Sequence, residues 1–362
     1  MSGIPADIHS LADYERHAAN LMPPASWHHV QEGSGPGHVP GVDRAAYDRI
    51  RLLPRRLTDL REGSTAVHLL GEHHVAPILL APVAYQRLAH EEGELATVRA
   101  ATALGIATIL STLSSVPMEE VAAAAAGAAR ELGRPSAPLW FQLYFQEDRA
   151  QTLSLVRRAE AAGYSAIVFT VDAAVKRGGF PLPPGVEAAN LRGMPPQRRA
   201  TPGGAILFGT PLTDLAPRWD DLAWLREQTN LPLLVKGLMA PEDARQAVDL
   251  GADALILSNH GERVLDSLPA AIDVLPLVRA AVGTDVPLLI DGGVRKGTDV
   301  VKALAMGAQA VLVGRPQIHA LAVGGFAGVA HMLQMLRAEL ELAMAQIGCA
   351  SPADIGPEHL FR

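Results

Sequence analysis

The chain has 362 residues, 49% of them hydrophobic, which is enough apolar material to bury a large core without a metal or an oligomer. Its 31 basic and 38 acidic residues give a net charge of -7 and form no basic stripe, so neither nucleic acid nor an anionic membrane is an expected partner. The single cysteine, Cys349, excludes an internal disulfide framework, and the N-terminus has no apolar run suited to a signal peptide or a membrane span, so we expect a cytoplasmic protein.

Residues 1–76 form a predicted N-terminal extension with a few helices and a glycine-rich turn from Glu32 to Gly37. From about residue 77 onward, short apolar segments alternate with stretches of helical period, a pattern typical of βα units around a parallel sheet. Eight strands are predicted, at residues 77–85, 107–112, 139–145, 166–172, 231–237, 254–259, 287–293 and 310–315.

Eight strands are the number that closes a TIM (β/α)8 barrel. The competing α/β architecture is a doubly wound open sheet. No GxGxxG follows the first strand, and polar residues recur at the strand ends, so the pattern favours the barrel. The predicted helices are Glu91–Leu104, Met118–Leu132, Arg149–Ala162, Pro241–Leu250 and Thr298–Met306, and glycines that can cap them stand at 105, 133, 163, 251 and 307.

Residues 173–218 are rich in proline and glycine and form an insertion after the fourth predicted strand. A long loop at that end of a barrel is usually a lid or a part of the site. We expect residues 1–362 to form one domain that includes this insertion.

Polar side chains stand at the carboxyl ends of nearly all predicted strands, where a TIM barrel builds its active site. In chain order they are Ser111, Gln142, Tyr144, Thr170, Asp172, Lys236, His260, Asp291 and Arg315. We therefore expect them to surround one pocket.

Glycines and arginines follow the last two predicted strands, in DGGVRKG (Asp291 to Gly297) and in Gly314 with Arg315. Exposed backbone amides, a helix N-terminus and a guanidinium together make a cradle for a phosphomonoester. Two tight turns with surface arginines are the alternative. Both arginines fall at the usual phosphate-binding corner of the barrel, which favours phosphate binding.

Lys236 ends the fifth predicted strand, where an apolar strand would otherwise finish buried. A buried ammonium needs a negative partner, and a structural ion pair would supply one. A cation beside the pyrimidine edge of a flavin would also stabilise the anion formed on reduction. Ser111, Gln142 and Thr170 offer neutral hydrogen bonds to such a ring, although each could equally be a satisfied core group.

The segment SNHGERVLD (Ser258 to Asp266) places His260 just past a strand end, with Arg263 three residues later. One loop can thus present a proton acceptor and a carboxylate anchor to the same small substrate. Lone histidines are more often structural, but the flanking Asn259, Gly261 and arginine favour catalysis. Asp172 is expected to orient the imidazole and stabilise its charged form.

The segments SNHGERVLD, LVKG, TVD, FQLY, APVA and DGGVRKGTDVVKALAMGAQAVLVGRP resemble the FMN-dependent 2-hydroxy acid oxidase and dehydrogenase family. This family includes glycolate oxidase, lactate oxidase and mandelate dehydrogenase, and the resemblance spans about residues 10 to 345. The stretches APVAYQRLAHEEGELA and STLSSVPMEE are most similar to 4-hydroxymandelate oxidases, which implies an aryl-substituted or otherwise bulky, mandelate-like substrate.

The resemblance implies oxidation of a 2-hydroxy acid to the 2-oxo acid, with His260 as base, Arg263 as carboxylate anchor, and Asp172 and Tyr144 completing the catalytic set. His29, Tyr144, His260 and Arg263 would face the substrate. The residues that would hold FMN are Pro82, Val83, Ala84, Ser111, Gln142, Thr170, Lys236, Ser258, Asp291, Gly292, Gly293, Arg295, Gly314 and Arg315.

Three positions depart from the family pattern. His29 stands where the family usually has a substrate-binding tyrosine, and the segment after Asp172 is shorter, so that Arg177 aligns beyond the usual second arginine. Glu262 occupies a position that is usually small, and we expect its carboxylate to raise the pKa of His260 or to repel an anionic substrate. These changes favour a bulkier or less charged substrate.

Three other functions remain open: an FMN barrel acting on an unusual natural-product intermediate, a non-redox flavin isomerase, and a catalytically degenerate FMN-binding protein. The electron acceptor is expected to be oxygen or a quinone, and the small Ala84 leaves room for oxygen. Relatives implied by the resemblance form tetramers, and the apolar C-terminal helix Gly328 to Ile347 is expected to lie in the interface of a homo-oligomer.

Overall fold

Eight parallel strands close into a barrel in the order in which they follow one another along the chain. They are β4 (Ile78–Leu80), β5 (Ala107–Ser111), β6 (Leu139–Leu143), β7 (Ala166–Thr170), β8 (Leu233–Lys236), β9 (Ala254–Leu257), β10 (Leu288–Ile290) and β11 (Ala310–Val313). The computed structural model describes residues 3–34, 40–175, 181–195, 208, 210, 213 and 216–361. All eight predicted strands are present, and the TIM barrel is confirmed.

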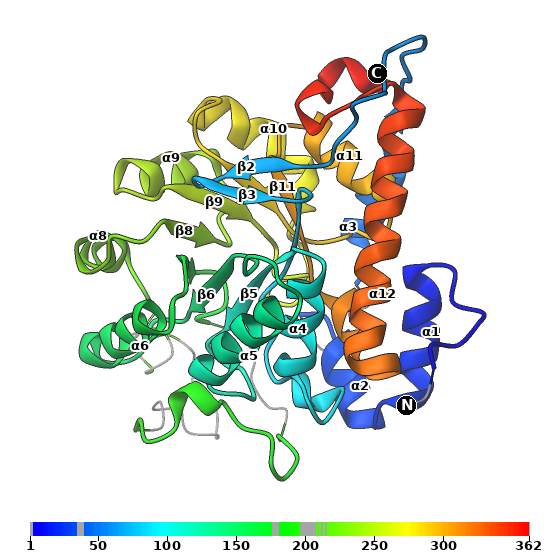
Figure 1. Cartoon of the computed structure of the whole chain (residues 1–362). Helices are drawn as coiled ribbons and strands as arrows, with labels where there is room; N and C mark the ends of the chain where they lie inside the picture. The colour runs from blue at the N-terminus through cyan, green and yellow to red at the C-terminus, as the bar shows by residue number, and fades with distance from the viewer. Residues whose placement is uncertain are drawn as a thin grey trace.

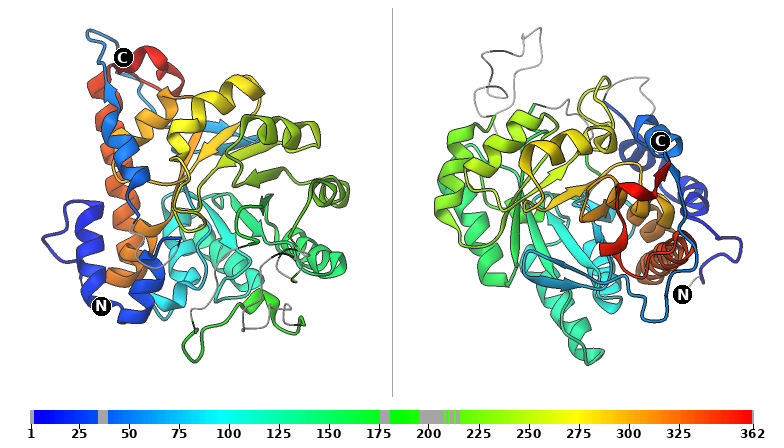
Figure 2. Two further views of the ribbon diagram at one scale, coloured as in Figure 1. Left: turned by 180° about the vertical axis from the view of Figure 1, so that it is seen from behind. Right: turned by 90° about the horizontal axis from the view of Figure 1, so that it is seen from above.

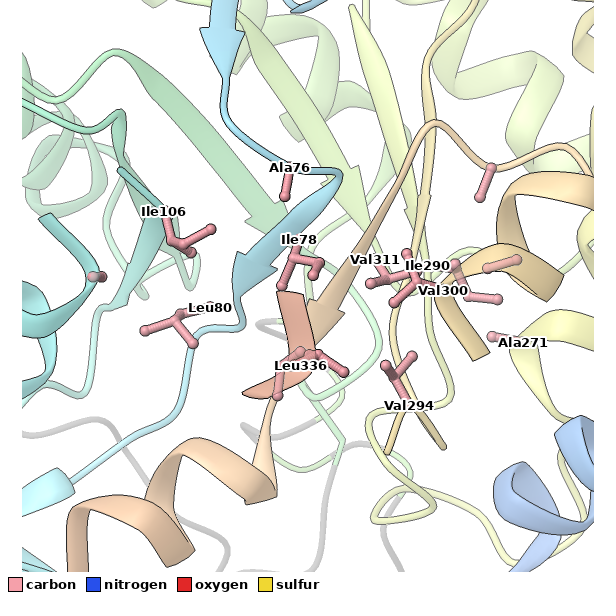
Figure 3. Packing of buried hydrophobic residues seen from close by; sticks show 14 of the residues in the cluster. Ala76, Ile78, Leu80, Ile106, Ala271, Ile290, Val294, Val300, Val311 and Leu336 are labelled. Carbon is pink, nitrogen blue, oxygen red and sulfur yellow. The ribbon is translucent and has the colours of Figure 1, made fainter. Parts of the chain in front are cut away.

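The strands divide their side chains between two cores, because successive residues of a strand point to opposite faces. One set of alternate residues points into the barrel and includes Leu79, Ile109, Trp140, Val168 and Ile256. The other set of alternate residues points outward and packs against the helices. Figure 3 shows part of this outer core, where Ile78, Ile290 and Val311 from three strands lie near Leu336 of the C-terminal helix.

Helices surround the barrel (Figures 1 and 2). They are α4 (Glu94–Ala103), α5 (Met118–Glu131), α6 (Arg149–Ala162), α8 (Trp219–Gln228), α9 (Pro241–Asp249), α10 (Ala271–Val282), α11 (Gly297–Ala305) and α12 (Arg315–Ile347). The five predicted helices match α4, α5, α6, α9 and α11 to within a few residues. The glycine predicted to end each of them has positive φ, as a left-handed helix cap requires.

The N-terminal extension contributes α1 (Leu11–Leu21), α2 (Pro24–Gln31), α3 (Val42–Arg49) and the hairpin of β2 (Val67–Leu69) and β3 (Glu72–His74). The hairpin packs Leu69 into the interior core, and Trp140 Nε1 donates to Glu72 at 3.1 Å. Short strand β1 (Arg51–Leu52) pairs with β12 (Leu360–Phe361) near the C-terminus. The predicted turn at Glu32–Gly37 lies partly outside the described residues.

The C-terminal helix α12 runs along one side of the barrel, beside α1 (Figures 1 and 2). It breaks at Gly324 and Gly325, and it packs against α1, α4 and α11. Among the described residues it is the one helix whose length and composition would suit a membrane span, but 56% of its most apolar stretch is buried within this chain. A large part of this helix is therefore covered by the chain itself, and the oligomer interface stays a prediction.

Candidate active site

Eight residues form a ring at the carboxyl face of the barrel, one from the end of each strand or just beyond it. Each of them stands two residues after a residue of the interior core, and because side chains alternate along a strand, each also faces inward. In barrel order they are Ala81, Ser111, Gln142, Thr170, Lys236, Ser258, Asp291 and Gly314. The ring is polar except at its first and last members, which is unusual for the end of a buried strand.

This ring opens into a cavity of about 420 Å³. The size falls within the range of small-molecule and cofactor sites, roughly 300–1,000 Å³. Of the fourteen residues predicted to hold FMN, thirteen line the cavity, and so do the predicted substrate residues His29, Tyr144, His260 and Arg263. The two predicted site residues that do not line it are Ser258 and Asp172, which lie behind Lys236 and His260.

Lys236 is held beneath the cavity between two partners. Its Nζ lies 2.9 Å from Asp291 Oδ2 and donates to Ser258 Oγ at 2.6 Å. Burial works to lower the pKa of Lys236, but the charges of Asp291 and Asp172 outweigh it, so the pKa is raised and the ammonium is retained. Ser258 Oγ also accepts from the His260 backbone N–H at 2.9 Å, so it links the lysine to the loop that carries His260.

Several buried polar atoms around the cavity have no hydrogen-bond partner among the described residues. They include Gln142 Nε2, Thr170 Oγ1 and Asp291 Oδ1. Gln142 is fixed on its other side, where its Oε1 accepts from Ser111 Oγ and the Thr112 N–H, both at 3.2 Å. Buried polar groups without partners are costly, so a ligand with matching donors and acceptors is expected there. An isoalloxazine ring, with its alternating carbonyls and nitrogens, fits this set.

Arg295 and Arg315, the two arginines predicted to bind phosphate, both line the cavity. Burial lowers the pKa of Arg315 to about 10, with the neighbouring charges of Arg263 and Arg295 adding to the effect. Burial likewise lowers the pKa of Arg295. Buried cations grouped in this way require an anion, and a phosphate monoester supplies two charges and three acceptor oxygens. The residues present therefore fit the phosphate as well as the ring of FMN.

His260 faces the cavity, and its Nδ1 lies 2.9 Å from Asp172 Oδ1, which is the contact predicted from the sequence. Burial works to raise the pKa of Asp172, but the charges of His260 and Lys236 outweigh it and lower the pKa, so the aspartate is ionised beside the imidazole. Gly237 makes room for this pair: its φ is +107°, and a Cβ there would lie 2.5 Å from Asp172 Cγ.

Arg263 reaches from the same loop to the C-terminal end of α2. Its Nη1 donates to Val30 O at 3.0 Å and its Nη2 lies 3.5 Å from Glu32 Oε1. His29 Nδ1 lies 3.4 Å from the same Glu32 oxygen. This part of the cavity lining thus holds one arginine and one histidine that both lie near the carboxylate of Glu32. Arg177, the position discussed for a second arginine, lies outside the described residues.

Glu262 corrects an expectation from the sequence. Its carboxylate does not line the cavity beside the imidazole. It accepts hydrogen bonds from the backbone N–H groups of Gly41, Val42 and Asp43, at the start of α3, at 2.8 to 3.1 Å. Its negative charge is therefore turned toward a helix N-terminus rather than toward a substrate.

Sequence reasoning missed several contributors to the site. Tyr85 lines the cavity just after the predicted segment Pro82–Ala84 and has a left-handed backbone, with φ of 54°. Asn190, from the insertion, donates to the carbonyls of Ser111 and Thr112 and accepts from the Met118 N–H, which ties the insertion to the barrel. No periodic signal marks such residues in the sequence.

Asp43 is a further buried acid that the sequence did not single out. Burial raises the pKa of its carboxyl to about 7; the hydrogen bond from Asn259 opposes this, and the charges of Glu262 and Asp291 add to it. A carboxyl with a higher pKa in the folded chain favours folding at low pH, and this contribution is lost as the pH rises from about 4 to about 7.

Replacing Asp43 with Asn keeps the oxygen that accepts from Asn259 and removes the titrating charge. In the flavin-free protein, we expect the variant to gain stability relative to wild type by roughly 1.4 kcal/mol per pH unit across this window, and no more above it. Urea unfolding of both proteins from about pH 5 to about pH 8 measures the difference. A difference that is constant with pH would contradict the assignment.

Comparisons with known proteins agree with this geometry. The family model described as FMN-dependent dehydrogenase matches residues 18–362. The chain is 48% identical to an L-lactate oxidase of Alicycliphilus denitrificans, over 97% of this chain and 96% of the relative, and 43% identical to a 4-hydroxymandelate oxidase of Amycolatopsis orientalis, over 94% and 95%. A crystal structure of mandelate oxidase with (S)-2-phenylpropionate superposes with a TM-score of 0.85 at 41% identity, covering 98% of each chain.

Proposed function

The chain belongs to the FMN-dependent dehydrogenase family, whose relatives oxidise 2-hydroxy acids, and we propose that its own substrate is a bulky, mandelate-like 2-hydroxy acid with His260 as the base. The observation that carries this proposal is the His260 imidazole, which faces the same cavity as the polar ring of strand ends and is held from behind by Asp172. A base and a set of unpartnered flavin-binding atoms thereby share one enclosed space.

Each catalytic side chain has a defined task in this proposal. FMN, when bound, would accept two electrons and one proton, the equivalent of a hydride, which leaves the second proton of the substrate for the base. Because His260 Nδ1 contacts Asp172, Nε2 is the ring nitrogen assigned to take the substrate proton. The ionised Asp172 then stabilises the imidazolium that forms. Arg263 binds the substrate carboxylate, and Tyr144, whose pKa is raised by burial, stays protonated and donates a hydrogen bond to the substrate.

Apolar and aromatic residues of the cavity support a bulky substituent on the substrate. Besides the polar set, the cavity is lined by Tyr85, Leu113, Phe145, Leu191 and Pro217. Aromatic and aliphatic walls of this kind stabilise an aryl ring by burying its apolar surface and by edge or stacked ring contacts.

We expect a mandelate-type acid to be turned over with a higher kcat/KM than L-lactate or glycolate. L-Lactate is the second candidate, because a relative that is 48% identical bears the name L-lactate oxidase. Anaerobic mixing of the holoenzyme with the three acids, while the flavin absorbance is followed, compares the reduction rates directly. Glycolate or lactate reducing the flavin much faster than mandelate would contradict the proposed substrate class.

The same experiment separates the other functions. Stoichiometric bleaching of the flavin by a 2-hydroxy acid contradicts a non-redox isomerase, and a protein that binds FMN but is never reduced would be catalytically degenerate. We propose oxygen as the electron acceptor, since several relatives are named oxidases. Hydrogen peroxide formed in step with the 2-oxo acid would support this, and a reduced flavin that persists in air would contradict it.

A further inference from the structure

The loop that carries His260 has a backbone conformation that most of its residues disfavour. His260, Gly261 and Glu262 have φ angles of 59°, 65° and 63°. Only glycine adopts the left-handed region without a steric penalty, so His260 and Glu262 persist there only if other contacts hold them. Such strain tends to occur where a side chain must be aimed for function.

The side chain of Glu262 provides such a contact. Its Oε1 accepts from the N–H groups of Gly41 and Asp43, both at 3.0 Å, and its Oε2 accepts from those of Gly41 and Val42, at 2.8 and 3.1 Å. These are the unpaired amides at the start of α3, which need an acceptor. Glu262 itself is only 5% exposed. One side chain thus fixes a catalytic loop to a helix more than two hundred residues earlier in the chain.

Asn259 makes a second pair of contacts, one with α3 and one with Glu262. Asn259 Nδ2 donates to Asp43 Oδ1 at 2.7 Å, and Asn259 Oδ1 accepts from the Glu262 N–H at 3.1 Å. The loop and the first turn of α3 therefore hold each other through reciprocal contacts of the Glu262 and Asp43 side chains. The catalytic imidazole lies between the two loop residues that make them.

The connection depends on charge. Burial works to raise the pKa of Glu262, but the hydrogen bonds from the three backbone amides and the charge of Arg315 outweigh it and lower the pKa. The carboxylate is therefore ionised, and the dipole of α3 favours the negative charge at this end of the helix. A glutamine in its place would bring an NH2 group, which is itself a donor, against the backbone N–H donors.

We propose that Glu262 is a positioning residue, whose carboxylate binds the first amides of α3 and holds the His260 loop in the left-handed conformation that aims the imidazole into the cavity. This inference rests on the proposed function of His260 as the base. Glu262 does not line the cavity, so it acts on the reaction through the backbone of its neighbour. Asp172 orients the ring of His260, and Glu262 orients its main chain.

The test is anaerobic flavin reduction in the holoenzyme, with mandelate as the probe, comparing wild type with Glu262→Gln. We expect the limiting reduction rate to fall by about tenfold to a hundredfold, as for a displacement of the base by about 1 Å. The substrate concentration for half-saturation and the FMN content are expected to stay close to wild type. Glu262→Asp, which keeps the charge, is expected to recover part of the rate.

Two further variants keep the test decisive. Asn259→Ala removes the second pair of contacts, those with Asp43 Oδ1 and the Glu262 N–H, and leaves Glu262 in place; it should lower the limiting rate less than Glu262→Gln. It decides the question if Glu262→Gln does not fold. Asp354→Asn is the matched control, since Asp354 also accepts a backbone N–H but lies outside the cavity, and its rate should match wild type.

The outcomes separate the two proposals. A wild-type flavin that no 2-hydroxy acid reduces would contradict the proposed function itself. A wild type that is reduced, together with Glu262 variants that melt earlier but reach the wild-type limiting rate, would overturn the positioning role alone.

Discussion

Replacing His260 with Ala is expected to lower the rate of 2-hydroxy acid oxidation by roughly 10² to 10⁴-fold, the range typical for loss of a general base. The imidazole is the proton acceptor of the loop: it faces the cavity, and its Nδ1 lies 2.9 Å from the ionised Asp172. FMN binding is expected to persist, because the ring and phosphate contacts come from other residues. Oxygen consumption with mandelate gives the rate, and the flavin absorbance gives the FMN content.

His68→Ala serves as the matched control for this change. His68 lies on the hairpin of β2 and β3, which packs against the amino ends of the barrel strands, and its loss is expected to leave the rate unchanged. A His260→Ala enzyme that keeps wild-type turnover would remove the residue from the mechanism. Loss of FMN together with activity would instead indicate that His260 holds the cofactor.

Replacing Lys236 with Met is the second large effect that the structure predicts. The methionine keeps most of the apolar stem but leaves Asp291 and Asp172 without the ammonium that stabilises them, and Lys236 is only 3% exposed. Removing one partner of a buried ion pair costs about 3–5 kcal/mol. We therefore expect a large loss in the free energy of unfolding of the flavin-free protein, together with weakened FMN binding.

Urea unfolding and quenching of FMN fluorescence measure the two effects separately. Lys302→Met is the control, because Lys302 is also largely buried but donates to Tyr47 O outside the cavity. It should lose some stability and keep its FMN affinity. If Lys236→Met binds FMN as tightly as wild type, the lysine does not belong to the flavin site.

The barrel and most of the site could be predicted from the sequence because both follow from local patterns. Short apolar runs gave the strands, and the period of two then places Gln142, Thr170 and Lys236 on the inward side of three successive strands. Parallel strands bring their carboxyl ends to one face, so a polar residue at each end is already a prediction of a pocket. No tertiary contact had to be known for this step.

The contacts from the N-terminal extension could not be predicted in this way. The Val30 carbonyl accepts from both Arg263 and Arg315, and Asp43 accepts from Asn259, across more than two hundred residues of sequence. Every residue has a backbone carbonyl, so the sequence does not mark which one accepts a hydrogen bond. A lone aspartate at the start of a helix suggests only a helix cap. The direction of Glu262 was wrongly predicted for the same reason, since its partners lie on α3.

We propose that the strand ends of one barrel hold FMN with the His260 imidazole facing it. The most direct measurement is anaerobic stopped-flow reduction of wild type and His260→Ala, each loaded with FMN, by mandelate. We predict that the yellow flavin band bleaches in the wild type and stays unchanged on the same timescale in the variant, with equal FMN in both. Equal bleaching in the two proteins, or a wild type that binds no FMN, would contradict the claim.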